Sequence, residues 1–177
     1  MTIKNTSIKK NTSIKQKTYS QSTILKDFLS DLPYATFLGI NITLKDNLLT
    51  SLLPYSPKLV GNPALPAIHG GVTASFLEIS AVLELYWASI SKNHQKGFNG
   101  LSKITQMDEF SHNQIPKTID FTVDYLRPGL PKDAYARAKI KRAGRRYASV
   151  YVEAWQNDKK KLYAQASGHF LMPHTNE

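Results

Sequence analysis

Apolar residues are densest between residues 69 and 91, and they predict one long helix there. They cover nearly every face of that helix: Val72, Ala74, Phe76, Leu77, Ile79, Ala81, Val82, Leu83, Leu85, Tyr86 and Trp87. A helix that is apolar all round must be buried on all sides, whereas one sheet covers only one side. The simplest way to bury the other side is to pack it against a second copy of the chain. We therefore expect a homodimer whose long helices pack together; whether dimers pair into tetramers stays open.

Period-two alternation of apolar and polar residues predicts antiparallel strands in the last third of the chain. The expected strands are 118–125, 134–142, 147–156 and 161–172. The turns between them are Arg127-Pro128-Gly129, Ala143-Gly144 and Asn157-Asp158. Alternation is clearest in the third strand, where Ala148, Val150, Val152 and Ala154 share one face. We expect the aromatic residues on its other face, Tyr147, Tyr151 and Trp155, to be sheet surface or packing rather than a nucleotide-stacking platform.

Shorter elements come before the long helix. We expect helices at 22–29 and 32–38, then strands at 40–44 and 48–53 around the turn Lys45-Asp46-Asn47. Residues 54–66 hold four prolines and should form an extended loop rather than an element. After the long helix, residues 101–110 predict a further small helix. This order indicates an α+β fold in which the long helix lies against one antiparallel sheet.

The charge of the chain is concentrated at its N-terminus. The net charge is +10, and the first 22 residues hold five lysines and no acidic residue. Residues 1–21 also repeat the motif Asn-Thr-Ser-Ile-Lys, which has too little apolar surface to fold. We expect a disordered basic tail at 1–21 and a single domain at 22–177. Such a tail can touch nucleic acid or anionic lipid, but without a supporting motif we expect neither partner.

Several function classes are excluded by what the chain lacks. It has no cysteine, which rules out a disulfide framework, a thiolate nucleophile and a Cys-ligated metal site. The absence of cysteine fits a reducing cytoplasm, where we expect the protein to act. The spacing expected of metal ligands is absent from His94, His112, His169 and His174. We therefore expect no metal and no cofactor. No uninterrupted apolar run of about 18 residues predicts a membrane span.

The start of the long helix carries the strongest chemical signal. His69-Gly70-Gly71 opens it, and Glu78 follows two turns later on the face of Gly71 and Ser75. A helix N-terminus presents unpaired N–H groups and partial positive charge, which suit an oxygen that is becoming negative. Burying a carboxylate in an apolar helix costs free energy, so we expect Glu78 to have a function. These parts predict carbonyl polarisation beside a carboxylate, which is the chemistry of acyl transfer to water.

The spacing of these groups predicts how the site is assembled. Eight residues separate Gly70 from Glu78, which is roughly 12 Å along a helix. A general base must lie within about 3 Å of the proton that it removes. One helix therefore cannot present both groups to the same carbonyl. If both act, Gly70 comes from one chain and Glu78 from the other, so that a dimer holds two shared sites.

The motif His69-Gly70-Gly71, the acid eight residues after Gly70, and residues 118–129 (Thr-Ile-Asp-Phe-Thr-Val-Asp-Tyr-Leu-Arg-Pro-Gly) resemble the hotdog-fold acyl-CoA thioesterases. Within that family the sequence looks most like the branch of the phenylacetic-acid-degradation thioesterases. The loop at 59–62 is similar to that of bacterial members acting on medium- or long-chain acyl-CoA in fatty-acid metabolism. The resemblance covers residues 33–172. It implies a hotdog fold, with an antiparallel sheet wrapped around a central helix, and a thioester hydrolase.

The resemblance also implies a role for each matching residue. Gly70 would supply the oxyanion-hole N–H, and Glu78 would act as general base or as nucleophile; the sequence leaves both open. Thr118 would help place the water, and His69 and Asn62 would orient the thioester and the loop. Many members carry Asp where this chain has Glu78. Gly71 and Ser75 would line the substrate side of the helix.

Two further features of the sequence allow more than one interpretation. Arg142, Arg145 and Arg146 surround a turn; they are either solvated or a seat for the phosphates of coenzyme A. Glu84 falls on another helix face than Glu78 and is expected to be structural or solvated. The function also has alternatives: a hydratase or dehydratase on the same fold, or a non-catalytic acyl-CoA-binding protein. The Gly-Gly helix start with its distant acid favours hydrolysis.

Overall fold

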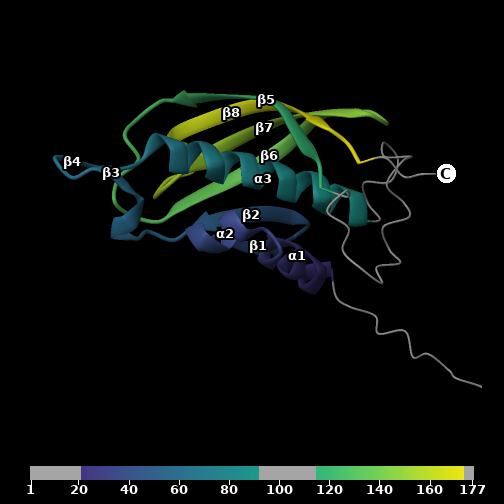
Figure 1. The fold of residues 1–177 in the computed structure, drawn as a ribbon, viewed down its shortest axis with the longest axis horizontal. Coiled ribbons are helices and arrows are strands. Elements are labelled where there is room, and N and C mark those ends of the chain that lie inside the picture. Colours follow the sequence, from purple (N-terminus) through teal and green to yellow (C-terminus); the bar gives the residue numbers. More distant parts are fainter. Residues whose placement is uncertain (1–20, 92–114, 174–177) are drawn as a thin grey trace, which may run out of the picture.

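A six-stranded antiparallel sheet packs against one long helix in the computed structural model, which describes residues 21–91 and 115–173 (Figure 1). The strand order is β1-β2-β6-β7-β8-β5. The strands are β1 (Asn41–Lys45), β2 (Leu48–Leu53), β5 (Lys117–Tyr125), β6 (Ala134–Ala143), β7 (Tyr147–Trp155) and β8 (Leu162–Leu171). The helix is α3 (Gly70–Ile90). This is the hotdog arrangement, and it confirms the expected α+β fold.

Small side chains on the inner face of the sheet let α3 lie close to it. The alternating residues Ala148, Val150, Val152 and Ala154 of β7 are buried, as the sequence predicts. Neighbouring strands contribute further buried alanines at the same layer: Ala134, Ala136, Ala164 and Ala166. The helix fills this trough with large side chains that are fully buried, namely Phe76, Leu77, Leu83 and Trp87. Each such side chain contributes about 1.5–3 kcal/mol by leaving water.

The N-terminal elements follow the sequence prediction closely. Helices α1 (Gln21–Ser30) and α2 (Pro33–Leu38) precede the β1–β2 hairpin. Gly39 ends α2 in the left-handed conformation, with φ of 72°. Asp46 and Asn47 take φ values of 52° and 59° in the hairpin turn. Two consecutive left-handed residues match the twist of an antiparallel pair, and Asp and Asn tolerate this conformation well.

The proline-rich segment differs from its prediction. Residues 54–66 were expected to form an extended loop, but they contain a 3-10 helix, η1 (Pro57–Leu59), and β3 (Val60–Asn62). Strand β3 pairs with β4 (Leu65–Ile68) in a separate two-stranded sheet. Both strands of such a ribbon are edge strands, so Pro66 can stand where no N–H is required. The expected helix at 101–110 and the tail at 1–20 lie outside the described residues.

Helix α3 is covered unevenly along its length. In its C-terminal half, α1 packs over it, and the rings of Phe28 and Tyr86 stack with centroids 3.8 Å apart. In its N-terminal half, Gly71 is exposed and Ser75 and Glu78 are half-buried. The sequence assigned the cover of the whole helix to a second copy, but α1 of the same chain covers its C-terminal half. The N-terminal half stays open within one chain, and its cover by a second copy stays a prediction. Within the described residues, no helix has the length and apolarity needed to cross a membrane.

Candidate active site

The turn before α3 is held by hydrogen bonds around His69. The backbone N–H of His69 donates to the Leu59 carbonyl at 2.8 Å, and its ring Nδ1 accepts the Gly71 N–H at 3.0 Å. Gly61 allows this close approach, since a Cβ there would lie 2.6 Å from the imidazole. Among the described residues, no hydrogen bond uses the Gly70 N–H. His69 thus caps the helix and leaves the Gly70 N–H available.

Residues 125–129 fix the same helix start from the sheet side. The Tyr125 hydroxyl donates to the Gly70 carbonyl at 2.8 Å. The Ile68 N–H donates to the Gly129 carbonyl at 2.7 Å, which ties the turn after β5 to the residue before His69. A Cβ at Gly129 would lie 3.1 Å from the ring of Tyr163, so glycine allows this packing. The motif that ends in Arg-Pro-Gly therefore positions the peptide that carries the candidate oxyanion donor.

Glu78 and Thr118 meet on the open face of α3. The Thr118 hydroxyl donates to Glu78 Oε1 at 2.6 Å, joining residues that are 40 positions apart in sequence. The bond is charge-assisted and orients the carboxylate. Of the predicted catalytic residues, these are the two that the structure brings into direct contact.

A β-bulge aims Thr118 at the helix. Thr118 pairs with Phe170 and Asp120 pairs with His169, so Ile119 is the extra residue between two successive pairs. The bulge turns Thr118 toward Glu78 and Asp120 toward the outer face of the sheet, although simple alternation would place both on one face. Sequence alternation alone gives no sign of this change.

Gly70 and Glu78 lie on one helix at opposite ends of the open face. Eight residues in α3 correspond to roughly 12 Å of rise. Between them, the Ser75 hydroxyl donates to the Gly71 carbonyl at 2.9 Å. Both Gly71 and Ser75 therefore belong to this face. Within one chain the structure does not bring the candidate oxyanion donor to the candidate carboxylate.

Asn62 stands apart from these groups. It ends β3, and its side-chain oxygen accepts the Ala64 N–H at 2.9 Å, so it shapes its own hairpin turn. That hairpin extends beyond the N-terminal end of α3 (Figure 1). No hydrogen bond among the described residues joins Asn62 to Glu78 or Thr118.

A cavity of about 370 Å³ at the turn between β6 and β7 is lined by Arg142, Arg145 and Arg146. We call it the arginine cavity. The other residues that line it are Gly144, Tyr147, Ala148, Ser149 and His169. Within residues 21–91 and 115–173, no ion pair joins these guanidinium groups to a carboxylate. The cavity and Thr118 share one end of the sheet, because His169 is next to the pairing partner of Thr118.

Sequence reasoning missed two contacts, one at each end of β5. His169 Nδ1 lies 3.0 Å from Asp120 Oδ1, and both side chains are more than half exposed. The bulge at Ile119 creates this pair, so no sequence signal pointed to it. Tyr125 was quoted in the family motif without a role, and its contact with Gly70 supplies one.

Glu84 is half-buried rather than fully solvated. It lies on α3 beside the buried residues Leu83 and Leu85. Burial raises the pKa of Glu84 to about 7, because a charged carboxylate is poorly solvated there. It is therefore a second titratable group of the helix, on another face than Glu78. Across the described ranges, no three His, Cys, Asp or Glu residues converge as metal ligands.

The fold and these residues define a class. Residues 65–163 match the Thioesterase superfamily, and the chain belongs to that family. It is therefore a thioester hydrolase. The matched range contains the His69 turn, all of α3, Thr118 and the arginine cavity apart from His169.

Individual proteins within and beyond this family are similar to the chain. The chain is 28% identical over 147 residues to the medium/long-chain acyl-CoA thioesterase YigI of Escherichia coli, covering 82% of this chain and 88% of YigI. A protein from Chromobacterium violaceum with a known crystal structure is 31% identical to this chain. The match covers 87% of this chain and 91% of that protein, with a TM-score of 0.58. The PaaI protein of the E. coli phenylacetic acid degradation operon is 15% identical, with a TM-score of 0.61 over 86% of this chain and 93% of PaaI. At that identity PaaI supports the fold alone.

Proposed function

We propose that this protein hydrolyses medium- or long-chain acyl-CoA thioesters at a site shared between two copies of the chain. The observation that carries the proposal is the Glu78–Thr118 pair on the open face of α3. Membership of the thioesterase superfamily and similarity to YigI support the substrate class.

The chemistry follows from the groups present. The Gly70 N–H and the helix dipole stabilise the negative charge that forms on the thioester oxygen. Glu78 removes a proton from the attacking water, or attacks the carbonyl carbon itself, and Thr118 fixes the carboxylate in place. The carbon–sulfur bond then breaks, and the thiolate of coenzyme A leaves and takes up a proton. Where Glu78 is the nucleophile, water then hydrolyses the acyl–glutamate anhydride, which releases the free acid and restores the carboxylate. His69 holds the helix start, and Asn62 shapes the adjoining loop.

Two surfaces support assembly into a dimer. Strand β5 is the last strand of the sheet, so one side of its backbone has no partner strand among the described residues. Its side chains Ile119 and Tyr125 are 53% and 55% exposed. The open face of α3 lies beside this edge, as the Glu78–Thr118 contact shows. A second copy that covers both surfaces would bring its own Gly70 toward Glu78.

The arginine cavity is the proposed seat for the phosphates of coenzyme A. Arg142, Arg145 and Arg146 supply positive charge that no described carboxylate neutralises. Guanidinium groups bind phosphate through paired, charge-assisted hydrogen bonds. The cavity lies at the Thr118 end of the sheet, where the thioester would also be placed.

Thiol release from acyl-CoA substrates of increasing chain length tests the proposal. We expect turnover by the wild type that is highest for medium or long chains. Glu78→Gln should lower kcat by about 10²- to 10⁴-fold while the protein stays folded, because the base or nucleophile is lost. Glu84→Gln is the matched control, since it changes the other glutamate of α3 and should retain turnover. Binding of acyl-CoA without turnover by the wild type would instead identify a non-catalytic acyl-CoA-binding protein.

A further inference from the structure

A row of polar side chains crosses four adjacent strands beside the arginine cavity. The strand register places Arg142 of β6 opposite Ser149 of β7, and Ser149 opposite His169 of β8. His169 in turn lies opposite Asp120 of β5. Buried residues alternate with these positions along β7 and β8, so the row points to the outer face of the sheet. Three of its four members line the arginine cavity, and Asp120 lies behind His169.

His169 is held by Asp120 on the side of the ring away from the cavity. Its Nδ1 lies 3.0 and 3.1 Å from the two carboxylate oxygens. Because β8 lies between β5 and β7, the opposite edge of the ring, which carries Nε2, is directed to the cavity. Both side chains are more than half exposed, and an exposed pair of this kind contributes little to stability. The contact therefore acts on the orientation and the charge of the ring.

The contact with Asp120 determines what Nε2 can do. A carboxylate accepts hydrogen bonds only, so Nδ1 carries the first proton of the ring. Nε2 of the neutral ring is then an acceptor and cannot bind an anion. A second proton makes Nε2 a donor, and an imidazole gains such a proton readily between pH 5 and 8. An anion in the cavity favours this doubly protonated form of His169.

The arginine cavity has more anion-binding groups than one diester phosphate can use. It brings together three guanidinium groups, the Ser149 hydroxyl and the His169 ring around about 370 Å³. Among the described residues, no hydrogen bond uses the Ser149 hydroxyl. A phosphate monoester has three terminal oxygens and close to two negative charges at pH 7. A diester has two such oxygens and one charge, so the donor set matches the monoester better.

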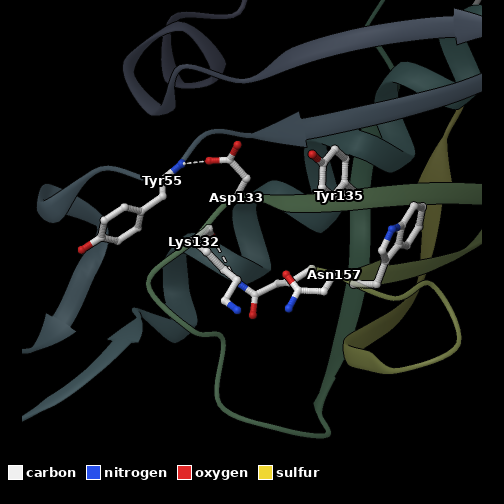
Figure 2. A pocket seen from close by; sticks show the side chains of 7 residues that line it. Tyr55, Lys132, Asp133, Tyr135 and Asn157 are labelled. Carbon is white, nitrogen blue, oxygen red and sulfur yellow. Dashed lines mark hydrogen bonds between the residues drawn. The ribbon is translucent and has the colours of Figure 1, made fainter.

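The cleft at the opposite end of the sheet lacks this excess of positive charge. It measures about 750 Å³ and is formed by the loop after β2, the start of β6 and the end of β7 (Figure 2). Its charged residues are Lys132 and Asp133, and Asp133 accepts the Tyr55 backbone N–H at 2.8 Å. The rings of Tyr135 and Trp155 stack on each other with centroids 6.2 Å apart, which leaves Trp155 8% exposed. We therefore assign no ligand to this cleft.

We propose that His169 makes the arginine cavity selective for a terminal phosphate monoester, with Asp120 as its positioning residue. The protonated ring donates from Nδ1 to Asp120 and from Nε2 to the phosphate, while Arg142 and Ser149 donate from the neighbouring strands. Coenzyme A carries one such monoester, its 3′-phosphate, beside a pyrophosphate. Coenzyme A as the ligand rests on the proposed function, whereas the preference for a monoester does not.

Titration calorimetry with coenzyme A and with 3′-dephospho-coenzyme A tests the proposal on the wild type. We expect coenzyme A to bind about tenfold more tightly or better, since charge-assisted hydrogen bonds are lost with the monoester. At pH 7.5, its binding should also take up as much as one proton, and that of dephospho-coenzyme A should take up none. Binding enthalpies in two buffers of different ionisation enthalpy measure this uptake.

The groups around His169 leave it as the source of the uptake. They are Asp120 on β5, Arg142 on β6, Tyr147 on β7, and Arg145 and Arg146 in the turn. Side chains of these types do not ordinarily change charge between pH 6.5 and 8.

Variants assign the effects to single residues. His169→Gln should weaken binding of coenzyme A about tenfold, abolish the proton uptake and leave binding of dephospho-coenzyme A unchanged. Asp120→Asn should lower the proton uptake and weaken coenzyme A less than His169→Gln does. Asp124→Asn is the matched control, because Asp124 lies on the same strand and face and bonds Gln165 instead. It should bind both ligands as the wild type does.

The outcomes separate this proposal from the proposed function. Equal affinity for the two ligands, or no saturable binding of coenzyme A at millimolar concentration, overturns the monoester site. It is also overturned if His169→Gln keeps both the preference and the proton uptake, or if Lys132→Gln weakens coenzyme A while Arg145→Gln does not. In each case, turnover of acyl-CoA by the same preparation would leave the proposed hydrolysis standing. A monoester preference without turnover would contradict the hydrolysis alone.

Discussion

The two halves of α3 have similar apolar sequences and different surroundings. The C-terminal half is enclosed within the chain, where Tyr86 and Trp87 are 1% and 0% exposed. The N-terminal half is enclosed by the sheet on one side only, and its other side presents Gly71, Ser75 and Glu78. The C-terminal half stabilises the fold, whereas the N-terminal half carries the proposed site. An all-round apolar helix can therefore be covered in two ways: here α1 of the same chain covers one half, and a second copy is proposed to cover the other.

Removing a ring from the enclosed half should have the largest effect on stability. Phe28→Ala deletes the side chain that stacks on Tyr86 and is 1% exposed. We expect the free energy of unfolding to fall by about 3–5 kcal/mol, the usual loss for a buried phenylalanine. Urea denaturation measures it. Tyr34→Ala, which removes a half-exposed ring from the neighbouring α2, should change stability by under about 0.5 kcal/mol. Equal losses in the two variants would contradict the comparison.

The half-buried carboxylate of Glu84 should make stability depend on pH. Its pKa is about 7 in the folded protein and near 4.5 when unfolded, so the folded state binds the proton more tightly. Its contribution is therefore fully present below pH 4.5 and is lost as pH rises through 7, by roughly 3 kcal/mol at most. We expect wild type to lose more stability than Glu84→Gln between pH 5 and pH 8. Parallel denaturation midpoints for the two proteins over this range would refute burial of the charge.

Breaking the contact on the open half should affect turnover rather than stability. Thr118→Val removes the hydrogen bond to Glu78 and keeps the shape of the side chain. We expect kcat to fall roughly 10- to 100-fold, since a hydrogen bond to a charged group contributes about 1.5–3 kcal/mol. Thr122→Val on the same strand, where alternation past the bulge places the side chain on the outer face, is the control. If both variants turn over normally, Thr118 has no role in positioning the carboxylate.

The sequence predicted the elements better than it predicted their contacts. Periodicity located α3 and all the strands of the large sheet, most clearly β7, where every second residue is buried. It failed at β3 and β4, where prolines concealed a short ribbon made only of edge strands. For the site, the family motif paired Glu78 with Thr118, and the structure brings these two side chains into contact; their catalytic roles stay predictions.

The contacts that could not be predicted from the sequence depend on a β-bulge, on strand register and on tertiary packing. The bulge at Ile119 decides that Thr118 meets Glu78 while Asp120 meets His169, and no residue type marks it. The stacking of Tyr135 on Trp155 depends on the pairing register of β6 and β7. The burial of Glu84 depends on tertiary packing. Such features arise from contacts between distant segments, which local patterns do not encode.

The central claim is that Gly70 of one copy and Glu78 of the other form one site. Gly70→Pro deletes the candidate oxyanion N–H with little other change, because proline suits the first helical position. His69, with φ of −56° and ψ of 136°, already has the conformation preferred before proline. Gly70→Ala, whose Cβ would lie 3.4 Å from the Tyr125 hydroxyl, keeps the N–H and is the matched control.

The most direct measurement co-expresses equal amounts of Gly70→Pro and Glu78→Gln and assays the purified random mixture of dimers. Each variant alone should be nearly inactive. In a mixed dimer, one shared site carries both defects and the other carries none, so a random equal mixture should regain about a quarter of wild-type activity. If Gly70 and Glu78 act within one chain, every site keeps one defect, and the mixture should stay as inactive as its parents. That result would contradict the shared site.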